Sequence, residues 1–240
     1  QIGRHLIRKL TKNNYKVVAV TRNIHQKGYI LKTQANPGYL EIVELNYFNL
    51  EKIESLVEEC SICINLIGIL FEKKKNLFKN IHTEFPDLLS KLSAKKNIEK
   101  LIHLSSLGIE KCLDSKYATS KLEGENKIKK NFEKAVVLKP SIVYSVDDSF
   151  TTSFMTLMNR LPIMPIYYEG KTKFAPIHVT DLVEIIYDVV QDGSKEQTIE
   201  CIGPEVLSFR EIILKLLKAT DKKRLLIPLP LSIAKLTAKF

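Results

Sequence analysis

The feature that most constrains the fold of this chain is a regular alternation of short apolar segments with amphipathic ones. Over the first 144 residues, β-branched apolar runs alternate with stretches in which apolar residues return every three or four positions. We expect strands at residues 16–20, 41–45, 61–68, 101–106 and 135–144, and helices at residues 2–10, 50–60, 78–92 and 116–130. Pro86 should kink the third of these helices or mark its effective start. Because the strands are apolar nearly throughout, the sequence predicts a doubly wound α/β fold with a parallel sheet covered by helices on both faces.

Gly3 lies at the start of the first expected helix, whose apolar face contains Ile2, Leu6, Ile7 and Leu10. In a dinucleotide-binding unit, the last glycine of the phosphate loop has this place, because a missing side chain lets the helix pack closely against a strand. A first strand and two further glycines would then lie upstream of the sequence. The alternative is a glycine at an ordinary bend of the chain.

The alternation weakens beyond residue 146. We expect a helix at residues 150–161, a Pro-rich irregular segment at 161–170, and then a short strand, a helix, a strand, a second helix and a Pro-rich tail. The sequence therefore predicts two domains. Residues 1–146 would form an N-terminally truncated Rossmann domain that binds NAD(P), and residues 147–240 a smaller lobe for substrate or partner, partly interleaved with the core and truncated at its end.

Composition limits the classes of protein to consider. The chain has 240 residues, of which 45% are hydrophobic, so it can bury a full core. Its apolar runs are shorter than the roughly 20 residues that cross a bilayer. Four cysteines are few for this length and suit a reducing compartment. Cys60 and Cys63 form a C-x-x-C pair, but no second pair or nearby histidine cluster accompanies them, so no metal site is expected.

The net charge of +10 raises three kinds of partner: nucleic acid, an anionic membrane or an acidic protein. The lysines are spread along the chain, and no nucleic-acid-binding signature accompanies them. A solvated basic surface is the favoured interpretation. Contact with a membrane or an acidic subunit comes next, and no nucleic acid is expected.

Tyr117 and Lys121 are the sharpest local signal for chemistry. They lie four residues apart in the segment KYATSK, which follows the strand that ends in Ser105 and Ser106. Residues four apart share one face of a helix, so both side chains can face one site. An ammonium beside a phenol lowers the pKa of the phenol from about 10, which would let Tyr117 exchange a proton with a carbonyl oxygen during hydride transfer. The alternative is an ordinary pair on a helix surface.

Two other signals are weaker. A second Y-x-x-x-K, at Tyr167 and Lys171, lies in an irregular segment containing glycine and follows no core strand. His82 lies near the expected cleft, where it would either tune a proton path or pack within its helix. His178 is expected to pack in the second lobe.

Several segments occur in a characteristic order along the chain: GRHL at the first helix, INLIGIL at a central strand, LIHLSSLG, KYATSKLEGE, LKPSIVY and APIHVTDLVEII. This ordered set resembles the short-chain dehydrogenase/reductase superfamily in its extended form, similar to NAD-dependent epimerases and dehydratases. Within it, SSLG, INLIG and the triplet at residues 82–84 are most similar to the atypical branch that contains the nucleotide-binding accessory subunit of respiratory complex I and its bacterial relatives. The resemblance extends over nearly the whole chain.

The resemblance implies a set of cofactor-binding residues, which are Gly3, Arg4, Arg22, Asn65, Leu66, Gly68, Tyr117, Lys121, Pro140 and Ser141. Arg22 directly follows the strand at residues 16–20, where an arginine accepts the adenosine 2′-phosphate and an acid would instead hold the 2′-hydroxyl. We therefore expect NADP(H) in preference to NAD(H). The alternative for Arg22 is an ordinary surface residue.

The candidate catalytic residues are Tyr117, Lys121, Ser105 and Ser106. Many relatives carry the catalytic hydroxyl at the position of Ser106 or one place beyond it, where this chain has Leu107. The resemblance therefore leaves two main functions. The favoured one is an accessory or assembly subunit of complex I with a mainly structural nucleotide; the other is an active oxidoreductase or epimerase acting on a carbonyl or alcohol, with Tyr117 as proton donor. A redox-sensing binder is a weaker third.

For the favoured role, the resemblance implies complex I subunits and an anionic membrane surface as partners. The protein would then lie in the cytoplasm, peripheral to the inner membrane, in a bacterium. In a eukaryote it would lie on the matrix side of the mitochondrial inner membrane.

Overall fold

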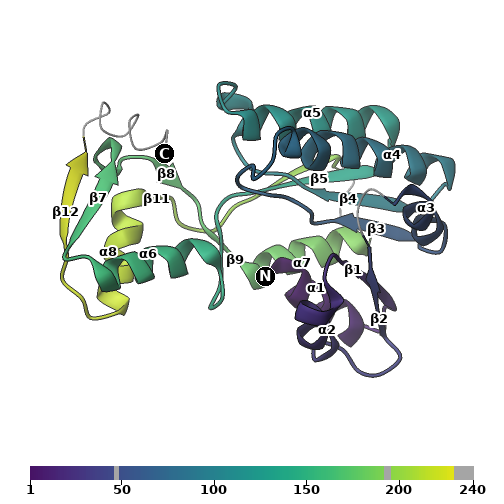
Figure 1. Cartoon of the computed structure of the whole chain (residues 1–240), viewed down its shortest axis with the longest axis horizontal. Coiled ribbons are helices and arrows are strands. Elements are labelled where there is room, and N and C mark those ends of the chain that lie inside the picture. The colour runs from purple at the N-terminus through teal and green to yellow at the C-terminus, as the bar shows by residue number, and fades with distance from the viewer. Residues whose placement is uncertain (46–48, 192–195, 230–240) are drawn as a thin grey trace. The chain divides into compact units, whose positions relative to one another are not determined.

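The computed structural model describes residues 1–45, 49–191 and 196–229, which form two compact units (Figure 1). The first unit comprises residues 1–140 and 180–201, and the second comprises residues 141–179 together with the chain from residue 202 onward. The chain thus leaves the first unit after Pro140, close to the boundary expected at residue 146. One helix and one strand, within residues 180–201, return to the first unit.

The core of the first unit is a parallel four-stranded sheet in the order β10-β5-β4-β3. Its strands are β3 (Ile62–Asn65), β4 (Lys100–Leu104), β5 (Ala135–Pro140) and β10 (Thr198–Cys201). Every residue of β5 is buried, as an apolar strand in the middle of a sheet must be. The predicted Rossmann-type α/β fold is therefore confirmed.

Helices cover both faces of this sheet (Figure 1). On one face lie α4 (Phe85–Lys95) and α5 (Lys116–Asn131), and on the other α1 (Ile2–Lys12) and α7 (Val179–Val190). A separate parallel pair, β1 (Val17–Thr21) with β2 (Leu40–Glu44), packs against α2 (Ile24–Lys32), whereas α3 (Leu50–Glu58) packs against α4. None of the helices in the described part of the chain has the length and apolar character needed to cross a bilayer.

The helix expected at residues 78–92 has two parts. It begins as the π-helix η1 (Lys79–Glu84), which leads directly into α4. Pro86 is the second residue of α4, and because it has no N–H it cannot donate a hydrogen bond to a carbonyl of the preceding π-helix. The prediction that Pro86 marks the effective start of the α-helix is confirmed. A short 3₁₀ turn, η2 (Ile109–Lys111), follows β4.

The described residues of the second unit form two helices and three short ladders. The helices are α6 (Ser149–Arg160) and α8 (Phe209–Ala219), and a 3₁₀ turn, η3, spans Tyr168–Gly170. The ladders join β6 (Val143–Tyr144) to β9 (Ile177–His178), β8 (Lys173–Phe174) to β11 (Leu207–Ser208), and β7 (Ile163–Tyr167) to β12 (Leu225–Leu229).

Three sequence-based expectations about elements were wrong. The strand expected at residues 135–144 is interrupted after Pro140, because Val143 pairs with a strand of the second unit. The segment at residues 161–170, expected to be irregular, contains β7, which pairs with β12 in the Pro-rich tail. The prolines of both strands are tolerated because each strand has one neighbour in its ladder. The helix α2 was not expected, although Asn23 caps it by accepting a hydrogen bond from the Gln26 N–H.

Candidate functional site

A cavity of about 480 Å³ lies in the first unit, beside the carboxyl ends of β1 and β3. It is lined by Val20, Thr21, Arg22, Asn23, Gln26, Lys27, Leu45, Leu66, Ile67, Gly68 and Phe85. Ligands of parallel α/β sheets bind at the carboxyl ends of the strands, and ligand pockets commonly enclose about 300–1,000 Å³. Both its position and its volume therefore suit a small-molecule site.

The wall of the cavity near α2 is basic. Among the described residues that line it, Arg22 and Lys27 are the charged ones and none is a carboxylate. The Glu44 carboxylate, nearby, accepts a hydrogen bond of 3.2 Å from the Ile24 N–H at the start of α2. A bound anion would therefore depend on the Arg22 and Lys27 side chains, because that backbone donor is already engaged.

Asn65 positions the residues that form the cavity wall opposite α2, although it does not line the cavity itself. Its side chain is buried, donates to Nδ1 of His103 at 3.0 Å and accepts from the Ile67 N–H at 3.0 Å. Burial, with a smaller contribution from the charge of Lys121, lowers the pKa of His103 to about 3, so its ring is neutral and can accept at Nδ1. Asn65 thus turns the chain after β3 so that Leu66 and Gly68 line the cavity.

The remaining residues expected to bind the cofactor differ in how close they lie to the cavity. Gly3 lies beside the cavity wall, since a Cβ on residue 3 would lie 3.6 Å from Cδ1 of Leu66. Arg4 is half-buried on α1 and is not among the lining residues. Pro140 accepts a hydrogen bond from the Leu107 N–H at 2.9 Å, and Ser141 begins the second unit, where its Oγ accepts from the Ala175 N–H.

Ser106, Tyr117 and Lys121 converge between the end of β4 and the start of α5. Ser115 caps α5, and the Tyr117 hydroxyl lies 2.8 Å from Oγ of Ser106. Lys121 is buried, with Nζ 5.7 Å from the centre of the Tyr117 ring and a hydrogen bond of 3.3 Å to the Leu104 carbonyl. The structure therefore brings together three of the four candidate catalytic residues.

Ser105 differs from its neighbour. Its Oγ is buried and has no hydrogen-bond partner within the described residues, while its N–H donates to the Leu138 carbonyl. Of the two serines, only Ser106 contacts the Tyr117 hydroxyl.

The expectation that Lys121 lowers the pKa of Tyr117 is wrong for this structure. Burial raises the pKa of the phenol, and the hydrogen bond from Ser106 opposes this only in part. Burial also lowers the pKa of Lys121 to about 8, against the opposing charge of Glu125. Tyr117 is therefore protonated at neutral pH, which suits a hydrogen-bond or proton donor better than a base.

Sequence reasoning missed several residues of the site. Lys27 and Ile67 line the cavity, and Phe78 lies edge-on to Tyr117 with ring centres 5.9 Å apart. The capping Asn23 ahead of a helical stretch was a signal that could have revealed α2 and, with it, Lys27. The second Y-x-x-x-K ends β7 and enters the η3 turn, so Tyr167 and Lys171 do not share a helix face.

The model of the family described as "NAD dependent epimerase/dehydratase family" matches residues 1–201. The chain belongs to this family. Its parallel sheet, its cavity at the carboxyl ends of two strands, and the Tyr117–Lys121 pair after β4 agree with that membership. Membership supports the binding of a nicotinamide dinucleotide.

Curated relatives include subunits of a respiratory enzyme. The NADH-ubiquinone oxidoreductase 40 kDa subunit of Neurospora crassa is 23% identical over 236 residues, which are 98% of this chain and 62% of that protein. The NADH dehydrogenase [ubiquinone] 1 alpha subcomplex subunit 9 of Dictyostelium discoideum is 26% identical over 212 residues, covering 88% of this chain and 59% of that one. Both names include the word mitochondrial. The chain spans about three fifths of the length of these relatives.

Solved structures of nucleotide-sugar epimerases and reductases share the fold. UDP-glucuronic acid 4-epimerase from Bacillus cereus, in complex with NAD, matches with a TM-score of 0.76 at 20% identity over 95% of this chain and 82% of its own. The dTDP-4-dehydrorhamnose reductase from Bacillus anthracis, in complex with NADP, matches with a TM-score of 0.69 at 19% identity over 91% and 85%.

Proposed function

We propose that this protein binds NADP(H) and acts as an accessory or assembly subunit of respiratory complex I, with a mainly structural role for the nucleotide. The observation that carries the role is the similarity to complex I subunits, which extends over 98% of this chain for the Neurospora protein. The family supports a nicotinamide dinucleotide, and the cavity beside β1 and β3 has room for part of one.

The preference for NADP(H) rests on the charge of that cavity. Arg22 and Lys27 line the wall next to β1, where an adenosine 2′-phosphate would carry two negative charges. The lining residues that the structure describes include no acid to hold a free 2′-hydroxyl. Charge-assisted hydrogen bonds from an arginine to a phosphate are among the stronger polar contacts in proteins.

The cofactor proposal is tested by measuring the affinity of the purified protein for NADPH and NADH. We expect NADPH to bind more tightly and Arg22→Ala to weaken NADPH binding about tenfold, which corresponds to about 1.4 kcal/mol, with little effect on NADH. Lys32→Ala is the matched control, since it removes an exposed cation at the far end of α2. Equal affinities that Arg22→Ala leaves unchanged would contradict the preference.

The complex I proposal is tested in membranes of the source cell. We expect the full-length protein to co-migrate with NADH:quinone oxidoreductase activity in native gels, before and after a high-salt wash. A protein that occurs only in a free pool would overturn the accessory role.

A peripheral location goes with this role. We propose that the protein lies against the inner membrane, on the cytoplasmic side in a bacterium or the matrix side in a mitochondrion. A chain of net charge +10 favours contact with acidic subunits or with anionic lipid headgroups.

A second candidate function is an NAD(P)-dependent oxidoreductase or epimerase acting on a carbonyl or alcohol. The hydrogen bond of 2.8 Å between Ser106 and the protonated Tyr117, with Lys121 beside them, is the observation that favours it. Among the relatives is the ceramide reductase of Caulobacter vibrioides, 22% identical over 75% of this chain and 55% of that enzyme. Steady turnover that disappears in Tyr117→Phe would favour this function over the structural one.

A further inference from the structure

His82 lies where the π-helix, the loop after β3 and helix α5 meet. Its ring is 2% exposed, Nε2 accepts a hydrogen bond of 3.1 Å from the Ile69 N–H, and Nδ1 lies 3.0 Å from Oγ of Ser120. A backbone N–H can only donate, so Nε2 carries no proton. The proton of the neutral ring is therefore on Nδ1, from which it is donated to Ser120.

Ser120 continues the same line of hydrogen bonds. Its hydroxyl donates to the backbone carbonyl of Tyr117 at 2.9 Å, which leaves the oxygen free to accept from His82. The donors thus run in one direction, from the amide of Ile69 through His82 and Ser120 to α5. A second ring proton on Nε2 would point at the amide proton of Ile69, so only the neutral ring fits this arrangement.

Aromatic packing holds the His82 ring in place. Phe78 stacks on it with ring centres 5.2 Å apart and planes at 20°, and Tyr117 meets it edge-on at 5.4 Å and 90°. Gly68 faces the same group, because a Cβ there would lie 3.7 Å from Nζ of Lys121 and 3.9 Å from Nε2 of His82. A residue that lines the cavity therefore lies directly against His82 and Lys121.

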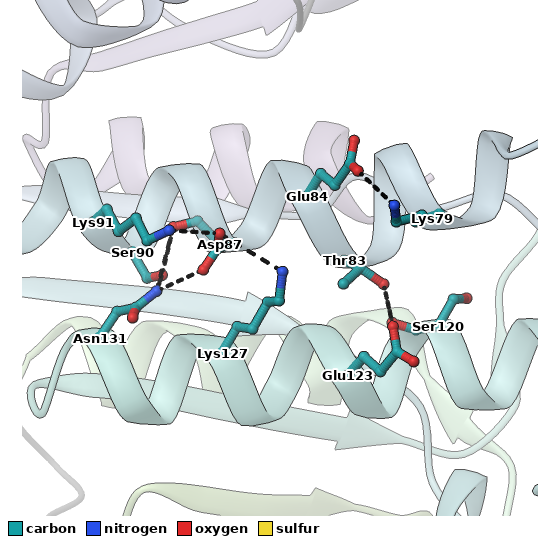
Figure 2. A network of polar contacts seen from close by, with 10 residues as sticks. All are labelled: Lys79, Thr83, Glu84, Asp87, Ser90, Lys91, Ser120, Glu123, Lys127 and Asn131. Carbon is teal, nitrogen blue, oxygen red and sulfur yellow. Dashed lines mark hydrogen bonds and ion pairs between the residues drawn. The ribbon is translucent and has the colours of Figure 1, made fainter.

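The π-helix that carries His82 is itself fastened to α5. Thr83 Oγ1 donates to the Ser120 carbonyl at 2.9 Å and lies 3.4 Å from the Glu123 carboxylate, as Figure 2 shows. Gly124 lets the two helices approach, since its missing Cβ would lie 1.9 Å from the His82 carbonyl oxygen. The backbone of His82 is thus fixed, while its ring reaches the loop.

The far end of the loop packs weakly against the residues that the structure describes. Leu70 and Phe71 are 76% and 65% exposed, so the residues next to Ile69 bury little apolar surface. The hydrogen bond from the Ile69 N–H to His82 therefore joins this part of the loop to the π-helix and, through Ser120, to α5.

We propose that His82, neutral and protonated on Nδ1, is a positioning residue that ties the loop of residues 66–71 to α5 and so holds the cavity wall formed by Leu66, Ile67 and Gly68. This role rests on the proposed nucleotide binding and makes it more specific. His82 acts through the loop and touches no reacting atom in this assignment.

Hydrogen exchange of the full chain, measured without nucleotide, tests directly whether His82 holds the Ile69 amide. We expect His82→Leu to speed exchange of the Ile69 amide at least tenfold. His82→Gln should restore part of the protection, because its amide oxygen can accept from the same N–H. Asn131→Ala is the matched control: it removes hydrogen bonds to Asp87 and Ser90 further along the same helix pair and should leave the loop unchanged (Figure 2).

Two further readouts separate this role from a general packing effect. In ¹⁵N spectra of the imidazoles, the signals of His82 are those that disappear in His82→Gln. In the wild-type protein these signals should show an unprotonated Nε2 and a protonated Nδ1. NADPH affinity should fall about tenfold in His82→Leu and stay unchanged in Asn131→Ala.

Unchanged exchange at Ile69 in His82→Leu, or a ring proton on Nε2, would overturn the assignment. A loosened loop with unaltered NADPH affinity would overturn the role in holding the cavity wall. If the wild-type protein binds no nicotinamide dinucleotide, the proposed function fails, while exchange at Ile69 still decides whether His82 holds the loop.

Discussion

Gly124 and His82 contact each other through the backbone: a Cβ on residue 124 would lie 1.9 Å from the His82 carbonyl oxygen. Glycine inside a helix costs about 0.5–1 kcal/mol relative to alanine. Gly124 therefore lowers the intrinsic stability of helix α5. In return, the missing side chain lets the π-helix that carries His82 pack closely against α5.

Gly124→Ala should lower the free energy of unfolding. Overpacking costs about 1–3 kcal/mol, which exceeds the gain in helix propensity at one position. Urea denaturation with the Gly68→Ala control checks this, because a Cβ at residue 68 would make only ordinary contacts of 3.7 Å or more. A Gly124→Ala variant as stable as the wild type would show that the π-helix can move away from α5 at little cost.

Stability should fall on acidification. Burial, followed by the charge of Lys121, lowers the pKa of His82 from 6.5 to about 4, and that of His103 to about 3. Between pH 6.5 and these values the unfolded chain binds protons that the native state does not, so the free energy of unfolding decreases as the pH falls through this window. The titratable groups around the two rings are Tyr117 and Lys121 of α5, together with the rings themselves.

Urea denaturation at pH 7, 6 and 5 checks this acid dependence. His82→Gln should show a shallower decrease than the wild type, because one of the two buried imidazoles is gone. His25→Gln, which changes an exposed histidine of α2, should follow the wild-type curve. A wild-type stability that stays flat over this range would contradict the neutral, buried assignment of both rings.

Lys139→Met should destabilise the first unit by about 3 kcal/mol. Lys139 Nζ lies 2.9 Å from the Glu110 carboxylate and 3.7 Å from that of Glu125, which is 2% exposed. Removing the lysine takes away the ion-pair partner of the buried Glu125 carboxylate and leaves the charge of Lys121 acting on it, and that loss is costly.

The double variant Lys139→Met/Glu125→Gln should recover much of this stability, because it removes the charge of Glu125 as well. Thermal unfolding of the two variants and the wild type makes the comparison. Equal losses in the single and double variants would show that packing around Lys139, and not charge, carries the effect.

Tyr117→Phe should leave the affinity for NADPH nearly unchanged but lower the rate of any reaction that the protein catalyses. The ring and its contacts with Phe78 and His82 remain, so we expect NADPH affinity within about threefold of wild type. Any turnover should fall at least about 100-fold, since a positioned proton donor contributes that much or more. Tyr167→Phe, at the exposed tyrosine of the second Y-x-x-x-K, is the control and should alter neither quantity.

The sequence by itself determined the alternation of strands and helices in the parallel sheet of the first unit, and it predicted where a candidate site would lie. Apolar spacing reports which face of a segment is buried, so strands near those expected and the helix that carries Tyr117 and Lys121 follow from local pattern alone. The carboxyl-end rule then places Ser106 and Tyr117 at one site, because a strand, a short loop and a helix leave them few other arrangements.

Only the tertiary structure decided the electrostatics and the long-range pairings. The raised pKa of Tyr117 comes from burial among side chains of other elements, such as Phe78 and His82, which no local pattern reports. Strands β7 and β12 pair across some sixty residues of chain, and Asn65 turns toward His103 because the neighbouring strand presents an acceptor there. Periodicity reports how each segment faces the core, whereas desolvation and pairing depend on which distant segment lies on the other side.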